Sequence, residues 1–367
     1  MFDRRLVTHF NWGLMILTLM VAALGLINLN SATATFDLKD QASLFHAQLL
    51  WTAIGASFLL VIVLIHYRHY RAMSYVIYAF GNLLLLLVLF VGRKIYGHQS
   101  WLAIGSFSLQ PTELAKITMI IGLSRLLADG QQRVSMDFKD LLPGLALILF
   151  PTFLVAKQGD LGSSFFFILI GGSLLLLRGI RWYVLVATIL LGMGVCTMGY
   201  FFFLSPYQKD GIATFMNPEL DRKGAGYQIV QAKIAVGAGG LWGTGYMKGQ
   251  TNKLKFVPER HTDFIFTVLA EECGFAGSFF LMILFLGFLL MGIYVGMKSH
   301  DLFSFYLCNG VIALFFWHMV VNLGGALGLI PLTGVPLPFL SYGGSSLLTN
   351  WIGIALILNV SMRRFMF

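Results

Sequence analysis

Ten long apolar segments, each bounded by charged residues or by glycine and proline, constrain this chain more than any other feature. They lie near 10–29, 47–65, 73–92, 112–128, 141–156, 161–177, 183–204, 264–297, 303–327 and 341–361. A helix needs about 20 apolar residues to cross a membrane. Only 11% of the residues are charged, against about 25% in soluble domains. The sequence therefore predicts an all-α polytopic membrane protein with about ten transmembrane helices, forming one domain over 1–367.

The basic residues predict how these helices are oriented. If the N-terminus is cytoplasmic, the inner connections hold most of the lysines and arginines, whereas the short outer connections hold Lys39, Arg93, Lys94 and Lys157. Cytoplasmic loops of membrane proteins are enriched in basic residues, so we expect both termini in the cytoplasm and the protein in the cytoplasmic (inner) membrane, in contact with its lipids. This placement also explains the net charge of +9, and no nucleic-acid partner is expected. The cysteines and histidines show no spacing typical of a metal site.

The connection at 205–262, between the seventh and eighth helices, is the long extracytoplasmic loop of this topology. Loops of this length are usually functional when they are ordered. Apolar residues recur with helical spacing over 227–236, which predicts either a helix on the membrane surface or a short packing helix. The glycine-rich stretch at 237–249 matches no nucleotide-binding motif and predicts a compact turn region.

Ionisable residues at membrane depth are functional candidates, because burying a charge in a bilayer is costly. Glu113 and Lys116 open the fourth span three residues apart. They share a helix face, where they form a local ion pair or position a substrate. Asp160 lies in a short outer connection, where it caps the next helix or contributes to a site.

Asp263 is the strongest catalytic candidate, because it stands where the long loop enters the membrane beside Arg260 and His261. A carboxylate can accept a proton, and neighbouring cations can stabilise an anionic leaving group; the alternative is a helix cap. The following helix is longer than a membrane is thick. We expect it to tilt, protrude or break near Gly274, with at least one glutamate of 271–272 facing a hydrated or protein-lined interior.

Three prolines and repeated glycines between the last two helices, over 322–346, predict non-helical backbone. Such backbone persists at membrane depth only where it is buried in protein or lines an aqueous cavity. We therefore expect this segment to form one wall of a site on the outer side. A carboxylate and cations at such a site favour a transferase that acts on an amphiphile with a phosphate-type leaving group.

The chain resembles the SEDS family of shape, elongation, division and sporulation proteins over nearly its whole length. Four segments carry the resemblance: 110–113 (QPTE), 159–162 (GDLG), 258–266 (PERHTDFIF) with the glutamates of 271–272, and 336–346 (PLPFLSYGGSS). Arg260 and the short termini resemble the RodA branch of the family more than the FtsW branch.

The resemblance implies a peptidoglycan glycosyltransferase that polymerises lipid II into glycan strands at the outer face of the cytoplasmic membrane, during cell elongation and shape maintenance. It implies a class B penicillin-binding protein as transpeptidase partner, and lipid II and a polyprenyl diphosphate-linked glycan as ligands. Asp263 takes the place of the family's essential aspartate, which predicts an inverting hexosyl transfer with this carboxylate as base. Substrate binding is predicted for Glu113, Lys116, Asp160, Arg260, His261, Ser341, Ser345 and Ser346. No cofactor is demanded, while a divalent cation bridging Asp263 and the diphosphate stays open.

The chain departs from the family pattern at Thr112, Gly159, Ala232 and Gly325. None of these departures removes a candidate catalytic group. Two other functions stay open: a lipid II flippase would use the cavity without forming a bond, and a non-catalytic scaffold of the elongation machinery would need no reactive carboxylate. The polar groups gather at one face and not along a path through the midplane, which favours the enzyme.

Overall fold

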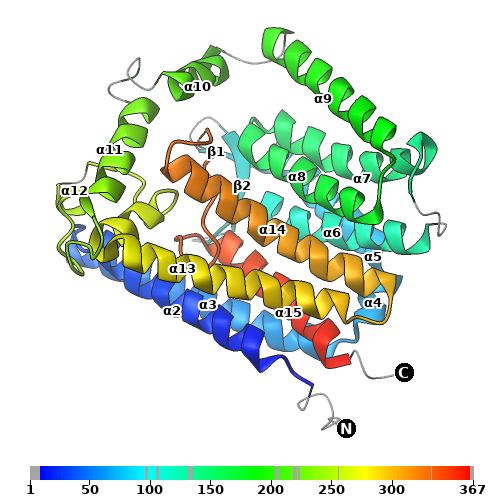
Figure 1. The fold of residues 1–367 in the computed structure, drawn as a ribbon, viewed down its shortest axis with the longest axis horizontal. Coiled ribbons are helices and arrows are strands. Elements are labelled where there is room, and N and C mark those ends of the chain that lie inside the picture. Colours follow the sequence, from blue (N-terminus) through cyan, green and yellow to red (C-terminus); the bar gives the residue numbers. More distant parts are fainter. Residues whose placement is uncertain are drawn as a thin grey trace.

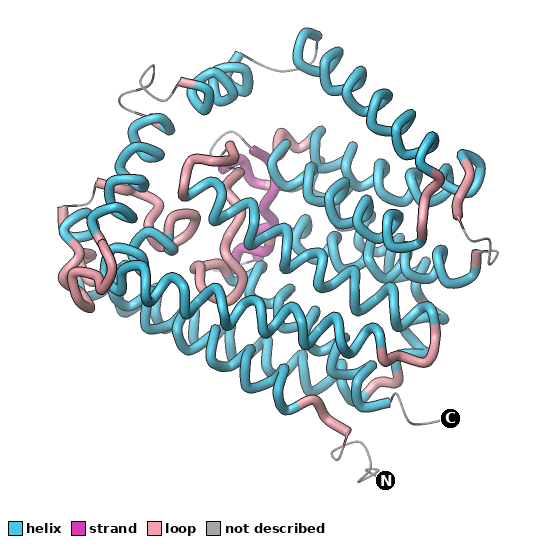
Figure 2. Tube along the Cα trace, in the orientation of Figure 1, coloured by secondary structure: helices cyan, strands magenta, loops and turns pink. Residues whose placement is uncertain are grey.

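The computed structural model describes residues 9–95, 98–104, 107–130, 135–202, 206–217, 221, 224–254, 256–331 and 333–363. These residues form a helical bundle (Figures 1 and 2). The long helices are α2 (Trp12–Thr33), α3 (Leu38–Leu64), α5 (Ser74–Val91), α6 (Pro111–Asp129), α7 (Phe138–Lys157), α8 (Leu161–Arg178), α9 (Trp182–Phe202), α13 (Ile265–Met297), α14 (Leu302–Ala326) and α15 (Gly344–Arg363). Each coincides with one predicted apolar segment, which confirms the all-α polytopic fold, although α3 begins well before the predicted 47.

Nine of these helices are long and apolar enough to cross a membrane, within the part of the chain that the structure describes. The remaining helix, α6, carries Glu113, Lys116, Arg125 and Asp129 and does not reach that standard. It packs against α5, α7, α8, α14 and α15. Because other helices surround it, α6 keeps its first charged residues away from lipid.

The helices differ sharply in how much of their surface other helices cover. In α15, 94% of the best membrane-spanning window is buried, whereas in α9 the share is 6%. A helix enclosed by protein can carry polar residues, and α15 buries Asn350 and Asn359. The exposed helix α9 and the short α10 (Pro206–Met216) form an arc beside the bundle in Figure 1.

A small antiparallel sheet in the connection between α5 and α6 was not anticipated from the sequence. It consists of β1 (Arg93–Ile95), β2 (His98–Ile104) and β3 (Phe107–Leu109), in the order β1-β2-β3. The amide of Gln99 donates a hydrogen bond to the carbonyl of Gln158 at 3.0 Å. The sheet is thereby joined to the turn between α7 and α8, and its last strand delivers the chain to Gln110 at the start of α6.

The long loop contains α11 (Ala225–Ala238), a predicted helix, and α12 (Gln250–Lys253). Helix α11 packs against α13. Its buried residues are Ile229, Ala232 and Ala235, while Val230 and Ile234 are exposed on the other face. Packing against α13 agrees with the packing alternative, while the exposed Val230 and Ile234 form the apolar outer face on which the surface alternative rests.

Helix α13 breaks at Gly274, as predicted, with φ 65° and ψ −161°. A Cβ atom at this position would lie 2.3 Å from the backbone nitrogen of Gly243, so only glycine fits. The glycine-rich loop satisfies the backbone groups that the break releases. Phe275 and Ala276 donate to the carbonyls of residues 240–241 at 2.9 and 3.0 Å, and residues 244–245 donate to the carbonyls of 271–272 at 3.0 Å.

Candidate functional site

Two non-helical segments meet at one end of the bundle. One is the loop at 258–263, just before α13, and the other is the segment 333–343 between α14 and α15, which we call the wall. The amide of Tyr342 donates to the carbonyl of His261 at 2.9 Å, and the Ser341 hydroxyl donates to the carbonyl of Thr262 at 2.7 Å. The expected wall therefore stands directly against the loop that carries Asp263.

Helix α14 fixes both segments through one buried amide. The Nδ2 atom of Asn322 donates to the backbone carbonyl of Asp263 at 2.9 Å and to that of Val335 at 2.8 Å. This side chain is 5% exposed. Because a buried amide with two backbone partners resists movement, Asn322 sets the position of Asp263 relative to the wall.

The Asp263 carboxylate does not cap α13. The capping position belongs to Phe264, which makes no side-chain capping bond, and no hydrogen bond reaches the carboxylate from the described residues. Burial, followed by the negative charge of Glu259, raises the pKa of Asp263 to about 6. A carboxylate with this pKa is mostly ionised at neutral pH and has an increased affinity for a proton, which suits a general base.

The wall reaches Asp263 at Gly334, whose φ is +65°. A Cβ atom there would lie 3.7 Å from Oδ2 of Asp263. On its other side the wall touches the turn that follows Asp160, since a Cβ atom at Gly162 would lie 2.6 Å from the carbonyl oxygen of Thr333. Residues 333–334 therefore lie between the Asp160 turn and Asp263.

Asp160 caps helix α8 by accepting a hydrogen bond from the amide of Ser163 at 2.9 Å, which confirms the capping alternative. Its second oxygen accepts from the side chain of Gln110 at 3.4 Å. The backbone N–H of Gln110 in turn donates to Oγ of Ser345 at 2.8 Å. Gln110 thus joins the start of α8 to the start of α15. The hydroxyl of Ser346 is buried and has no hydrogen-bond partner among the residues that the structure describes.

Glu113 and Lys116 form the predicted ion pair, with Nζ 2.8 Å from Oε1 of Glu113. The same Nζ lies 2.8 Å from Nε2 of His318 on α14 and 5.1 Å from the centroid of the Phe166 ring. The Lys116 side chain is fully buried. Because its ammonium group contacts both a carboxylate and an imidazole, it fixes α6 against α14.

His318 was missed by the sequence analysis, although a histidine inside the apolar segment 303–327 is itself an ionisable residue at membrane depth. It lies four residues before Asn322, so both side chains project from the same face of α14. Through His318 this face contacts Lys116, and through Asn322 it contacts Asp263. Helix α14 therefore connects the buried ion pair to the candidate base.

The structure does not bring Arg260 to the Asp263 carboxylate. Its Nε donates to the carbonyl of Ala32 at 2.9 Å and its Nη2 to the hydroxyl of Thr35. The guanidinium also stacks over the ring of Phe36 at 5.0 Å. These contacts tie the loop to the end of α2, and they give no support to the predicted role of Arg260 at the leaving group.

His261 is held between aromatic rings, 5.6 Å from Phe36 and 6.1 Å from Tyr342 between centroids. Burial is the first cause that lowers the pKa of its imidazole. A neutral imidazole is therefore favoured at physiological pH. His261 does not supply a permanent positive charge for an anionic leaving group.

Glu271 and Glu272 both face protein, as expected for at least one of them. The Ser31 hydroxyl donates to Oε1 of Glu272 at 2.6 Å, and the amide of Thr251 donates to Oε1 of Glu271 at 2.9 Å. The two carboxylates thereby hold α2 and the short helix α12 against α13. Among the described residues, no three histidine, cysteine, aspartate or glutamate side chains gather closely enough to hold a metal ion.

Comparison with known proteins gives consistent matches over the whole bundle. Residues 11–365 match the model of the FtsW/RodA/SpoVE family, described as cell cycle protein. The peptidoglycan glycosyltransferase MrdB of Escherichia coli K12 is 35% identical over 312 residues, which cover 85% of this chain and 84% of MrdB.

Among the solved structures that are similar to this fold, two illustrate the likeness. One is a chain from a structure on the coordination of polymerization and crosslinking by a peptidoglycan synthase complex, with a TM-score of 0.85 and 31% identity, covering 98% of this chain and 99% of that one. The other is the rod shape determining protein RodA of Thermus thermophilus, with a TM-score of 0.73 and 28% identity, covering 98% of both chains.

Proposed function

The chain belongs to the FtsW/RodA/SpoVE family, and we infer that it is a peptidoglycan glycosyltransferase of cell elongation, similar to MrdB and RodA. One observation carries the chemistry: the carboxylate of Asp263 has a raised pKa and no hydrogen-bond partner among the described residues, and Gly334 of the wall lies beside it. Such a group is available to a substrate hydroxyl.

The proposed substrate is lipid II, which adds to a glycan linked to polyprenyl diphosphate. Asp263 takes the proton from the sugar hydroxyl of lipid II while the hydroxyl oxygen attacks the anomeric carbon of the growing strand. The bond from this carbon to the diphosphate oxygen breaks, the electron pair leaves with the polyprenyl diphosphate, and the anomeric configuration inverts. The new glycosidic bond lengthens the strand by one lipid II unit.

Glu113, Lys116 and His318 act as positioning residues in this proposal. Their contacts fix α6 against α14, and α14 holds the backbone of Asp263 through Asn322. A second group of positioning residues lies where the wall contacts the Asp160 turn. There Gln110 is hydrogen-bonded to both Asp160 and Ser345. A divalent cation at Asp263 would take the substrate's phosphate oxygens among its ligands; the proposed step is written through the chain's own groups.

We further propose a class B penicillin-binding protein as the transpeptidase partner. Support comes from the likeness to a chain of a peptidoglycan synthase complex that coordinates polymerization and crosslinking. The distribution of basic residues supports cytoplasmic termini, so that the site opens on the outer face of the cytoplasmic (inner) membrane.

Polymerisation of purified lipid II tests the enzyme directly. We expect glycan strands from the native protein with its partner, and a loss of at least about 100-fold in rate for Asp263→Asn, which keeps the shape of the side chain but removes the base. Lys157→Gln is the matched control, since Lys157 is exposed at the same end of the bundle.

Two outcomes would contradict the proposal. Full activity of Asp263→Asn would exclude Asp263 as the general base. If the native protein moved labelled lipid II between leaflets without forming polymer, it would be a flippase. A correctly assembled complex that does neither would leave the scaffold function.

A further inference from the structure

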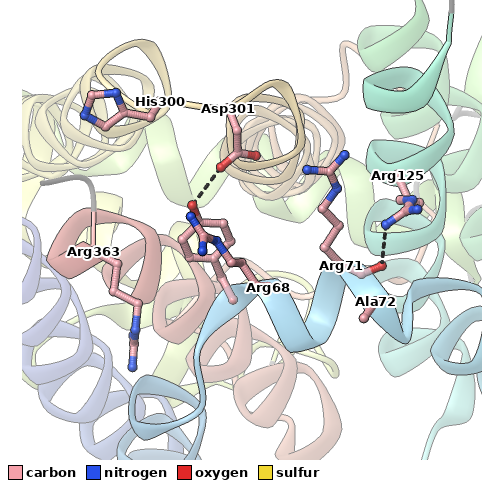
Figure 3. A pocket seen from close by; sticks show the side chains of 8 residues that line it. Arg68, Arg71, Ala72, Arg125, His300, Asp301 and Arg363 are labelled. Atoms are coloured by element: carbon pink, nitrogen blue, oxygen red, sulfur yellow. Dashed lines mark hydrogen bonds between the residues drawn. The ribbon is translucent and has the colours of Figure 1, made fainter. Parts of the chain in front are cut away.

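A cavity of about 440 Å³ lies at the end of the bundle opposite to Asp263. Figure 3 shows the side chains that converge on it from α4 (Tyr67–Ala72), from the end of α6, from the start of α14 and from the end of α15. Its lining includes Arg68, Arg71, Arg125, His300, Asp301 and Arg363. Both described chain ends lie on this side (Figure 1).

Positive charge exceeds negative charge around this cavity. Arg71 and Arg125 share one carboxylate, that of Asp129. Arg363 is 5% exposed, and its guanidinium donates to the carbonyls of residues 63–64 at 2.8 and 3.1 Å and to the side chain of Asn359 at 2.9 Å. These acceptors are neutral, so they satisfy its hydrogen bonds without compensating its charge.

Four arginines line the cavity, and they outnumber the carboxylates that line it or pair with them, which are those of Asp129 and Asp301. The carboxylate of Asp301 accepts from the amide of Ser304 at 2.9 Å and from its hydroxyl at 3.0 Å, and it also accepts from the Tyr67 hydroxyl at 2.8 Å. Arg68 is exposed, and its guanidinium has no hydrogen bond or ion pair within the part of the chain that the structure describes. Its guanidinium donors are therefore accessible to an external acceptor.

The same positive charge acts on the pKa of the nearby imidazole of His66. Burial lowers its pKa, and the charges of Arg363 and Arg68 lower it further. The field and the geometry both favour an anion with several oxygens, since the planar guanidinium group matches the oxygen spacing of phosphate.

The surroundings of the cavity favour a lipid as the source of this phosphate. The exposed apolar side chains of Met73 (53%) and Leu302 (40%) directly follow the lining residues 72 and 301, which offers acyl chains a contact surface. The volume suits a small headgroup, and basic pockets between transmembrane helices bind anionic headgroups. We propose that this cavity binds the phosphate headgroup of an anionic membrane lipid, away from the glycosyl-transfer site.

Lipid binding to the purified full chain tests this proposal without any polymerisation assay. Native mass spectrometry with phosphatidylglycerol, compared with phosphatidylcholine, gives the apparent affinity of each lipid. We expect preferential binding of phosphatidylglycerol, and roughly tenfold weaker binding by Arg68→Gln, because one charge-assisted contact to the phosphate is lost. Arg68→Lys keeps the charge without the planar guanidinium group, so its affinity for phosphatidylglycerol should lie between those of the native chain and Arg68→Gln.

The matched control is Arg181→Gln, which removes an exposed arginine outside this cavity and should bind as the native chain does. Equal binding of the two lipids would overturn the proposal, as would equal weakening by Arg181→Gln and Arg68→Gln. Displacement of the lipid by an equal concentration of glycerol 3-phosphate would assign the cavity to a soluble phosphate instead. Unchanged thermal unfolding of each variant verifies that its fold is intact.

Discussion

Asp263 combines an ionisable side chain with a surrounding made mainly of backbone. The loop and the wall meet around it through carbonyl and amide groups, and Gly334 lets the wall approach its carboxylate. In this environment burial disfavours the charged form, which is why the pKa of the group rises. The residue that the sequence identifies as the base is therefore also a residue whose protonation changes close to neutral pH.

We expect the rate of polymerisation to fall as the pH decreases through about 6, because protonated Asp263 cannot accept a proton. Replacing Glu259 by glutamine removes a negative charge that raises this pKa, so the midpoint should move to lower pH. Rates of lipid II polymerisation between pH 5 and 8 measure both effects. A rate that is constant across this range would exclude Asp263 as the base.

The buried ion pair should dominate the stability of α6. Lys116→Met leaves Glu113 buried and uncompensated, so we expect a loss of about 3–5 kcal/mol in the free energy of unfolding. The double variant Glu113→Gln/Lys116→Met removes both charges and should recover most of this loss. Thermal unfolding in detergent compares them.

The activity of the same double variant separates two roles of the pair. A positioning role predicts a slower maximal rate with little change in the lipid II concentration at half-maximal rate. Equal destabilisation of the single and double variants would show that the two charges do not stabilise each other.

Single residues were predictable where their type is unusual for the place they occupy. Asp263, Glu113 and Asp160 stand out in an apolar sequence. In the structure, Glu113 belongs to the buried ion pair that α14 connects to Asp263, and Asp160 is hydrogen-bonded to Gln110. The engagement of Arg260 with α2 was not predictable, because its partners at 32 and 35 are a backbone carbonyl and an ordinary hydroxyl distant in sequence.

The elements of the fold were largely predictable, because each transmembrane helix must satisfy its own backbone inside an apolar segment. One exception is the sheet at 93–109, where β1 and β3 have three residues each and β2 (HQSWLAI) does not alternate between apolar and polar residues. The break in α13 was foreseeable from its length, but the partner of the break was not. That partner is the glycine-rich loop, which supplies hydrogen bonds to both sides of Gly274.

Gly274→Ala should destabilise the junction of α13 and this loop. The new Cβ atom would collide with the backbone of Gly243, and alanine disfavours the positive φ, so we expect a loss of about 1–3 kcal/mol. Gly192→Ala in α9 is the matched control, since no heavy atom lies within 4 Å of a Cβ there. The temperature of thermal unfolding should fall for Gly274→Ala and stay constant or rise for Gly192→Ala. The reverse order would contradict the role of the junction.

At the scale of the whole molecule, the two proposed sites lie at opposite ends of the same helices. Helices α6, α14 and α15 each have one end near the Asp263 loop or the wall and the other end at the arginine-lined cavity. This arrangement follows from helices that cross the bundle once. If the termini are cytoplasmic, the cavity faces the cytoplasm and the glycosyl-transfer site faces outward.

Cysteine labelling tests this orientation. In a background without Cys196, Cys273 and Cys308, we expect Lys248→Cys to react with an impermeant maleimide in intact spheroplasts, since the long loop lies outside. His69→Cys should react only after the membrane is permeabilised. Both positions are exposed, so differences in burial do not explain a difference in labelling. The opposite pattern would reverse the proposed topology.

The polar character of α6 has a consequence for how the protein is made. The ribosome delivers helices to the insertion machinery in order, and α6 emerges long before α14, which supplies His318 to its lysine. A charged residue at the centre of an isolated helix costs about 2.5–3.5 kcal/mol to insert, and less toward the helix ends. Helix α6 therefore depends on α5 and later helices for stable integration, so the final assembly of its charged end awaits synthesis of the C-terminal part of the chain.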